Sequence, residues 1–217
     1  MKAFRDVGQE TSLETIAFHN VGQQTLFETN AFRDVGQETS QPHWERWGIF
    51  NVGAVVVVEH GLYFGKAEFY DFIRKTGGEW ADSKERPLVC MMKSLEYKDI
   101  YWAIPIGNWN HRDQAGKDRI NRYLALPQED LRSCYYHVGN TDVKSIFFIS
   151  DAVPITTEYV EREYVNRYTG QIYIIQNKPL IVEIERKLKR ILAFEKKRNN
   201  YFRQHITDLV EELTNRL

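Results

Sequence analysis

A polar segment at residues 107–117 carries the side chains best suited to chemistry. It reads Gly-Asn-Trp-Asn-His-Arg-Asp-Gln-Ala-Gly-Lys and directly follows an apolar stretch. His111 can act as an acid or a base, while Asn108, Arg112 and Lys117 can donate hydrogen bonds to a phosphate. RNA cleavage without a metal needs such groups: a base for the 2′-hydroxyl, donors for the pentavalent phosphate and an acid for the leaving 5′-oxygen.

A cation on a neighbouring strand, Arg86, is predicted to reach the same loop. The predicted catalytic residues are therefore Arg86, Asn108, His111 and Lys117, and the predicted RNA-binding residues of the loop are Trp109, Asn110 and Arg112. Two alternatives stay open. His111 could be a surface histidine without chemistry, and Trp109 could pack in the core rather than stack on a base.

The sequence shows no pattern for a metal or a nucleotide cofactor. The histidines after residue 58 are isolated from one another, and neither Cys90 nor Cys134 has a second cysteine two residues on. The segment Gly61–Gly65 lacks the third glycine and the Lys-Ser/Thr end of a phosphate-binding loop. We therefore predict no metal site and no cofactor, and an unrelated small-molecule enzyme has no motif to support it.

The first 44 residues contain a repeat with a period of 14 residues. Ala3–Ser12 recurs unchanged as Ala31–Ser40, and residues 17–26 are a looser copy. A disordered low-complexity arm is one explanation of this composition. A second explanation is that the repeats are the translation of a tandem DNA repeat with a unit of 42 nucleotides. It accounts better for the differences between the copies, because each difference can be made by one nucleotide change. On that hypothesis the working start lies near residues 52–58.

This leader changes the charge that is assigned to the rest of the chain. All 217 residues sum to −1, but residues 58–217 hold 25 Lys and Arg against 23 Asp and Glu. We divide the chain into repeats at 1–44, a linker or leader at 45–57 and a single globular domain at 58–217.

No run approaches the roughly 18 apolar residues of a membrane span, and neither a secretory signal nor a disulfide framework is evident. The protein is expected in the cytoplasm, without a membrane partner.

The downstream domain has the element pattern of an α+β fold. A short helix is expected at 66–75, ending at a pair of glycines. Strands are expected at 86–92, 99–106, 145–150 and 171–175. A helix is expected after Thr157 through Tyr164, and two amphipathic helices with apolar stripes at 181–192 and 206–217 close the chain.

The C-terminal quarter also carries a run of cations. Eight lie between Arg186 and Arg203, with Glu195 as the only acid among them. They form either a solvated helix face or a track for phosphates. The second alternative predicts RNA contacts at Lys187, Arg190, Lys197, Arg198 and Arg203.

Five short motifs follow one another in a characteristic order: Phe69-Tyr70, Arg86-Pro87, Tyr101-Trp-Ala-Ile-Pro-Ile106, Ile146–Ser150 and Pro154–Thr156. Together they resemble the toxins of type III toxin–antitoxin systems, the ToxN/AbiQ group and above all its CptN branch, over roughly residues 61–192. The resemblance implies a compact, strongly bent antiparallel β-barrel of the PemK/MazF-like, SH3-like kind, with flanking helices and a helical C-terminus. It also implies a metal-free endoribonuclease of phage defence that leaves a 2′,3′-cyclic phosphate on mRNA and is neutralised by a small antitoxin RNA in an RNA-bridged homo-oligomer.

The resemblance also bears on the leader and on the loop. In that family the antitoxin gene is a tandem array of short DNA repeats upstream of the toxin gene, as the 42-nucleotide repeat would be. The family places hydroxyl residues and a lysine after the strand where this chain has Gly107-Asn108, and its strand-opening cation maps onto Arg86. Either His111, Arg112 and Lys117 supply the chemistry from a shifted loop, or the chain is a catalytically impaired or non-enzymatic RNA-binding domain.

Overall fold

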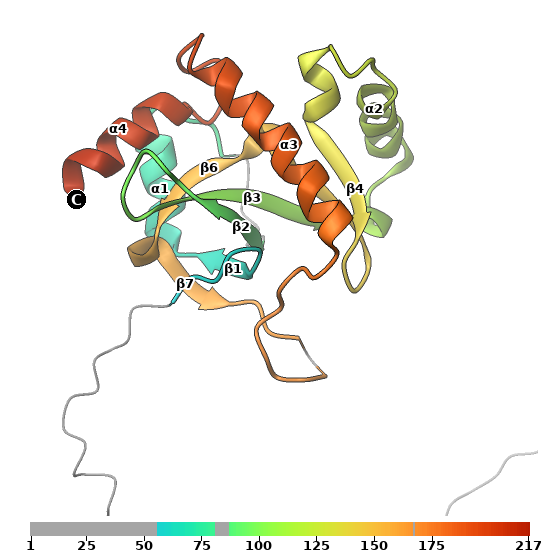
Figure 1. The fold of residues 1–217 in the computed structure, drawn as a ribbon, viewed down its shortest axis with the longest axis horizontal. Coiled ribbons are helices and arrows are strands. Elements are labelled where there is room, and N and C mark those ends of the chain that lie inside the picture. Colours follow the sequence, from blue (N-terminus) through green and yellow to red (C-terminus); the bar gives the residue numbers. More distant parts are fainter. Residues whose placement is uncertain (1–55, 81–86, 167) are drawn as a thin grey trace, which may run out of the picture. The chain divides into compact units, whose positions relative to one another are not determined.

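The computed structural model describes residues 56–80, 87–166 and 168–217, which combine an antiparallel sheet with four helices (Figure 1). The predicted α+β class is therefore confirmed. The repeats at 1–44, nearly all of the segment 45–57 and the predicted site residue Arg86 lie outside the described residues.

The strands pair in the order β4-β5-β3-β2-β1-β7, and β6 also pairs with β3. Every pairing between them is antiparallel. One edge of β3 pairs with β2, and its other edge is shared by β6 and β5. Among the described strands the ladder ends at β4 and β7, so the sheet does not close into a complete barrel. The strands are β1 Leu62–Gly65, β2 Leu88–Lys93, β3 Ile100–Asn108, β4 Tyr136–Asn140, β5 Lys144–Phe148, β6 Val153–Thr156 and β7 Val160–Glu163.

The helices cover both faces of this sheet. They are α1 Ala67–Lys75, α2 Gln114–Leu124, α3 Lys178–Glu195 and α4 Ile206–Arg216. Figure 1 shows α3 crossing one face, with α1 and α4 together at one end of the sheet and α2 beside β4 at the other. No helix in the described ranges has the length and apolar character that a membrane crossing requires.

The predicted glycine end of the first helix is confirmed. Gly77 follows α1 with φ at +91°, a conformation that glycine adopts without steric cost. The N–H of Gly78 donates to the carbonyl of Ile73 at 2.9 Å, and that of Gly77 donates to Arg74 at 3.1 Å. This pair of bonds satisfies two carbonyls that the end of a helix otherwise leaves open.

Alternation along β3 creates two apolar cores. Trp102, Ile104 and Ile106 join the core beneath α3, whereas Ala103 joins the core beneath α1. Helix α4 belongs to both, because Ile206 and Val210 lie in the first core and Leu209 and Leu213 in the second. The two apolar stripes predicted near the C-terminus are thus core faces.

Two of the predicted elements differ from the structure. The helix expected from Thr157 to Tyr164 is wrong, because a single 3₁₀ turn at Thr157–Tyr159 leads into β7, which pairs with β1. The strand expected at 171–175 contributes only isolated bridges, from Ile172 to Val165 and from Ile174 to Gly61. Strands β1 and β4 and helix α2 were not predicted at all.

One buried carboxylate orders the turn between α3 and α4. Glu195 is 3% exposed and accepts hydrogen bonds from the N–H of Asn200 at 2.7 Å and the N–H of Tyr201 at 3.2 Å. It also accepts from the Oγ1 of Thr207 at 2.8 Å, in the first turn of α4. A buried carboxylate is tolerated only with such partners, so Glu195 joins the end of α3 to the start of α4.

Replacing this carboxylate tests how far the turn depends on it. Glu195→Gln should lower the free energy of unfolding by about 2 to 3 kcal/mol, because the neutral amide accepts more weakly and turns a donor toward other donors. Denaturant unfolding of the full chain measures the change. Glu211→Gln, at an exposed position of α4, is the matched control and should stay within about 0.5 kcal/mol of the native chain. Equal losses in the two variants would contradict the assignment.

A buried lysine of α3 lies against β4, close to His137 of that strand. Lys187 is 6% exposed, and its Nζ donates to the carbonyl of Tyr136 at 2.8 Å. Burial and the nearby Lys187 ammonium lower the pKa of His137 to about 4, with Glu183 acting in the opposite direction and Arg186 in the same direction as Lys187. His137 is therefore neutral in the folded protein at neutral pH.

This lowered pKa predicts a loss of stability in mild acid. The unfolded chain binds the proton at its ordinary pKa of about 6.5, before the folded chain does, so stability is full above that pH and falls as the pH drops toward 4. Because His137 is partly exposed, solvent screening reduces its contribution to this fall to about 2 kcal/mol. Denaturant unfolding between pH 7 and pH 4 should show a flatter profile for His137→Gln than for the native chain. Parallel profiles would show that His137 is not responsible.

Candidate functional site

The predicted loop begins where β3 ends. Asn108 is the last residue of β3, and a 3₁₀ turn follows at Trp109–His111. The Oδ1 of Asn108 accepts the N–H of Asn110 at 2.8 Å, which caps the turn. His111 is exposed at the end of this turn, where solvent and a ligand can both reach it.

Trp109 packs on the protein, which is one of the two alternatives that the sequence left open, and base stacking stays a prediction. Its ring packs against the small core of Ile120 and Ile146 that holds α2 on the sheet. The ammonium groups of Lys117 and Lys144 lie over the ring, 6.0 Å and 5.0 Å from its centroid. The side chain is therefore a packed ring with two lysine ammonium groups over it. Lys144 was missed by the sequence analysis, and the pairing of β3 with β5 brings it here.

Arg112 lies across an aromatic ring because its neighbour Gly107 has no side chain. The Arg112 guanidinium carbon is 4.9 Å from the centroid of the Phe148 ring. A Cβ at Gly107 would lie 3.3 Å from the Nη2 of Arg112 and 3.2 Å from the Cε2 of Phe148. Gly107 thus leaves room for a stacked guanidinium.

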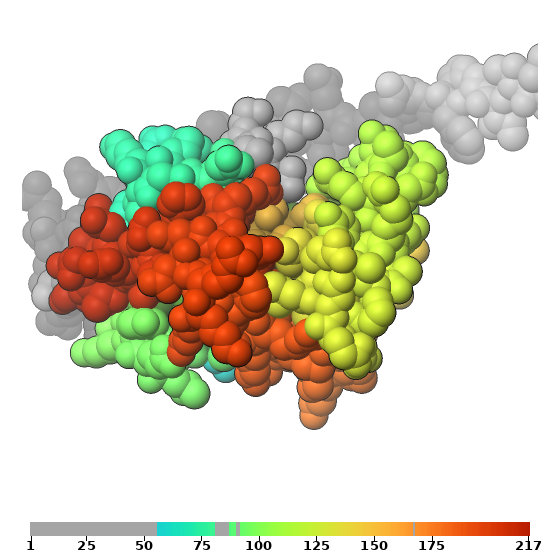
Figure 2. Space-filling view, turned by 90° about the horizontal axis from the view of Figure 1, so that it is seen from above, coloured from blue at the N-terminus to red at the C-terminus, as the bar shows by residue number. Residues whose placement is uncertain are grey.

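Arg112 and Phe148 form part of a cleft of about 480 Å³, which we call the arginine cleft. One wall comes from the loop and α2, a second from the segments before β4 and after β5, and a third from the turn between α3 and α4. In Figure 2 the C-terminal helices, in red, lie between the β2–β3 turn, in green, and α2 and β4, in yellow-green. The lining residues are Arg112, Arg119, Tyr123, Tyr135, Tyr136, Phe148, Ser150, Asp151, Tyr201, Phe202 and Arg203.

The charges of the arginine cleft are predominantly positive. Arg112, Arg119 and Arg203 face a single acid, Asp151. The Nη2 of Arg203 lies 2.6 Å from the Oδ2 of Asp151, so this pair fixes one guanidinium in place. With three guanidinium groups and one carboxylate among its lining residues, the cleft carries a net positive charge, which suits it to an anion.

Two tyrosines of the cleft, Tyr135 and Tyr136, have raised pKa values. Burial raises the pKa of Tyr136, and burial together with a hydrogen bond to Tyr201 raises the pKa of Tyr135. Both therefore keep their O–H protons and cannot act as bases. Tyr123 stacks on Tyr135 at 5.6 Å and meets Tyr136 edge to face at 5.6 Å, so the rings support one another.

The basic run of the C-terminal helices divides into three groups. Lys187 is a correction to the predicted RNA contacts, because it is buried on the carbonyl of Tyr136 and cannot face solvent. Arg190 is bound to the carbonyls of residues 128–129 and ties α3 to that loop. Lys197 and Arg198 are exposed, and Arg203 enters the arginine cleft. The run is therefore not one continuous track.

The structure thus brings together residues that the sequence separates. Of the predicted RNA-binding residues, Arg112 and Arg203 share the arginine cleft, and the predicted loop borders it. The cleft tyrosines and Arg119 were not predicted. A helix beginning at Asp113, the N-cap of α2, would have placed Arg119 and Tyr123 on one helix face, because they are four residues apart. In the ranges that the structure describes, no three His, Cys, Asp or Glu side chains gather as a metal ion would require.

The contact between Gly107 and Arg112 can be tested by filling the space. Gly107→Val should lower the free energy of unfolding by about 1 to 3 kcal/mol, because the added methyl groups overlap the guanidinium and the Phe148 ring. The loss should be smaller on an Arg112→Ala background, which removes one of the overlapping groups. Strictly additive losses in the double variant would contradict the contact. Denaturant unfolding of all four chains gives the coupling.

Comparison with known proteins finds similarity among solved structures alone. No family model matches the sequence, and neither does any curated protein. Among solved structures, the chain is similar to AbiQ, a lactococcal anti-phage endoribonuclease belonging to the type-III toxin–antitoxin system. The TM-score is 0.48 at 14% sequence identity, over 72% of this chain and 96% of the AbiQ chain.

Proposed function

We propose that the chain is a metal-free endoribonuclease, the toxin of a type III toxin–antitoxin system, and that RNA binds in the arginine cleft. The observation that carries the proposal is the cleft itself: three guanidinium groups and one acid among protonated tyrosines, beside the loop at 107–117. Guanidinium groups suit phosphates, and aromatic rings suit unstacked bases. The sequence motifs described above supply the class of reaction.

The reaction that these groups fit is transfer of a phosphodiester within the RNA. The 2′-oxygen loses its proton to a base and forms a bond to phosphorus, and the bond from phosphorus to the 5′-oxygen breaks. The leaving oxygen takes a proton from an acid, so the products are a 2′,3′-cyclic phosphate and a 5′-hydroxyl. Arg112 and Arg119 are placed to hold the phosphate, and the tyrosine O–H groups can donate to its oxygens.

Proton transfer is assigned to the rim of the cleft. We assign it to His111, which is exposed next to Arg112 in the chain, with Asn108 at the end of β3 and Lys117 in the first turn of α2 as further donors. Arg86, outside the described residues, keeps its predicted role as a phosphate ligand. The proposed partners are mRNA substrates and an antitoxin RNA, whose 42-nucleotide repeats we propose to be the source of residues 1–44.

Cleavage of RNA by the full chain in the presence of EDTA tests the proposal. Arg112→Ala should reduce the rate about 100-fold, the usual cost of one donor to the transition state. Arg162→Ala is the matched control, because Arg162 also lies over a phenylalanine ring, 3.7 Å from the centroid of Phe64, but outside the cleft lining. Equal rates for the two variants, or cleavage that needs a metal, would contradict the proposal.

A second measurement separates cleavage from binding. His111→Ala should cut RNA at least about 100-fold more slowly while its affinity for RNA changes little, since its charge is not needed to hold the phosphate. The second candidate function is an RNA-binding domain without activity, which the Gly107-Asn108 pair in place of hydroxyl residues favours. Salt-dependent RNA binding without a cyclic phosphate product would establish that alternative.

A further inference from the structure

Two lysine ammonium groups lie over one indole ring outside the lining of the arginine cleft. The Nζ of Lys144 is 5.0 Å from the centroid of the Trp109 ring, and the Nζ of Lys117 is 6.0 Å from it. In the part of the chain that the structure describes, no acid forms an ion pair with either lysine. We call these three residues the lysine site, and none of them lines the arginine cleft.

The acids closest to these lysines in the chain are engaged in local hydrogen bonds. Asp113 accepts a backbone N–H as the N-cap of α2, and Asp118 accepts from the side-chain amide of Gln114 at 2.7 Å. Asp142 accepts from the hydroxyl of Thr141 at 3.1 Å. An anion that binds at the lysine site therefore has no ion pair to displace, and two positive charges attract it.

Strand β5 places the lysine site and part of the arginine cleft along one of its faces. Lys144, Ile146 and Phe148 alternate onto the same face, because successive side chains of a strand point to opposite sides. Ile146 and Phe148 belong to the small core on which Trp109 packs. At the far end of the strand the guanidinium of Arg112 lies over the Phe148 ring. A cation over an aromatic ring thus stands at each end of β5, on one face.

The length of β5 determines which anions can use both ends. Four residues separate Lys144 from Phe148, which corresponds to about 13 Å along a strand. A single phosphate cannot contact both ends, whereas a nucleic-acid strand carries a phosphate at every nucleotide. Lys144 is exposed, so a strand can pass over it. The spacing therefore selects an oligonucleotide over a mononucleotide or inorganic phosphate.

We propose that the lysine site holds a backbone phosphate of the same single-stranded RNA whose reacting phosphate binds in the arginine cleft, with Lys144 as the main ligand. The inference rests on the proposed function and deepens it, because it adds a contact beyond the reacting phosphate. It also gives the direction in which the RNA leaves the cleft, along β5 from Phe148 toward Lys144. Lys117 supplies the second charge, and the Trp109 ring holds both ammonium groups in place.

Binding of RNA probes of two lengths to the full chain tests the proposal. The probes are uniformly 2′-O-methylated, because a blocked 2′-oxygen cannot attack the phosphate. A dinucleotide has one phosphodiester and occupies the arginine cleft alone, whereas an octanucleotide also reaches the lysine site. Lys144→Ala should weaken octanucleotide binding about 3-fold to 10-fold and reduce the slope of log affinity against log salt by about 0.7, the share of one single-stranded phosphate contact. Its affinity for the dinucleotide, measured by competition, should equal that of the native chain.

Two matched variants separate this contact from a general effect of charge. Lys144→Arg keeps the cation and should retain the octanucleotide affinity. Lys66→Ala removes an exposed lysine at the start of α1, outside the cleft lining, and should leave both affinities unchanged.

The results also distinguish failure of the lysine site from failure of the proposed function. If Lys144→Ala binds the octanucleotide as Lys66→Ala does, or weakens both probes equally, the lysine site is overturned and the proposed function stands. A native chain that binds neither probe would overturn the proposed function and the lysine site together.

Discussion

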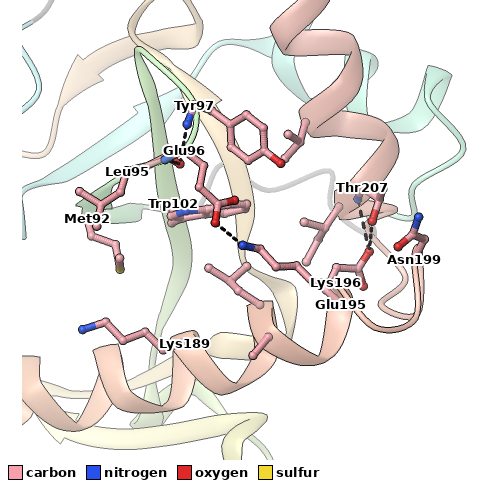
Figure 3. Close-up of a pocket in the computed structure, with 15 residues that line it drawn as sticks. Met92, Leu95, Glu96, Tyr97, Trp102, Lys189, Glu195, Lys196, Asn199 and Thr207 are labelled. Carbon is pink, nitrogen blue, oxygen red and sulfur yellow. Dashed lines mark hydrogen bonds and ion pairs between the residues drawn. The ribbon is translucent and has the colours of Figure 1, made fainter.

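The buried carboxylate of Glu195 is the interaction on which two cavities depend. It is the last residue of α3, and its oxygens accept from Asn200, Tyr201 and Thr207 across the turn. The residues that follow it face two ways. Tyr201–Arg203 line the arginine cleft, while Asn199, Ile206 and Thr207 line a second cavity of about 490 Å³ between the β2–β3 turn and the C-terminal helices (Figure 3). Two residues of this turn, Asn200 and His205, have positive φ, which the chain adopts only where the surroundings hold it. A single acid in a run of cations therefore organises a wall shared by two surfaces.

Gly107 has a comparable effect on the opposite wall of the cleft. A side chain there would occupy the space in which Arg112 stacks on Phe148. The small residue and the stacked guanidinium are thus one feature, because the absence of a side chain at Gly107 leaves room for Arg112. On the proposed function, positive charge that stabilises the phosphate comes from this stacked arginine, which presents its donors in a fixed plane.

The sequence predicted those elements that are recognised from the spacing of neighbouring residues alone. The glycine end of α1 and the apolar stripes of α3 and α4 follow from residue spacing, and the structure confirms them. The segment after Thr157 was misassigned because a capping residue before an acidic stretch resembles a helix start, whereas pairing with β1 makes it strand β7. Lys187 was misassigned because its position in a basic run does not reveal that its ammonium is buried on the Tyr136 carbonyl. The arginine cleft could not be predicted from local sequence patterns either. Its lining residues Tyr123, Tyr135 and Arg203 are distant in the sequence and are brought together only by the tertiary fold.

The distribution of cations also bears on the RNA contact proposed above. Lys187 and Arg190 hold α3 against its neighbours, and Lys196 holds the β2–β3 turn, so three of the eight cations of the basic run are used within the protein. Of the same run, Arg203 joins Arg112 and Arg119 in the arginine cleft, while Lys197 and Arg198 are exposed outside its lining. Affinity that comes from a few oriented arginines and aromatic stacking depends less steeply on salt than affinity from a charged track, because fewer counterions are released. On the proposed function, the cleft therefore favours single-stranded RNA, whose bases can leave the stack, over duplexes.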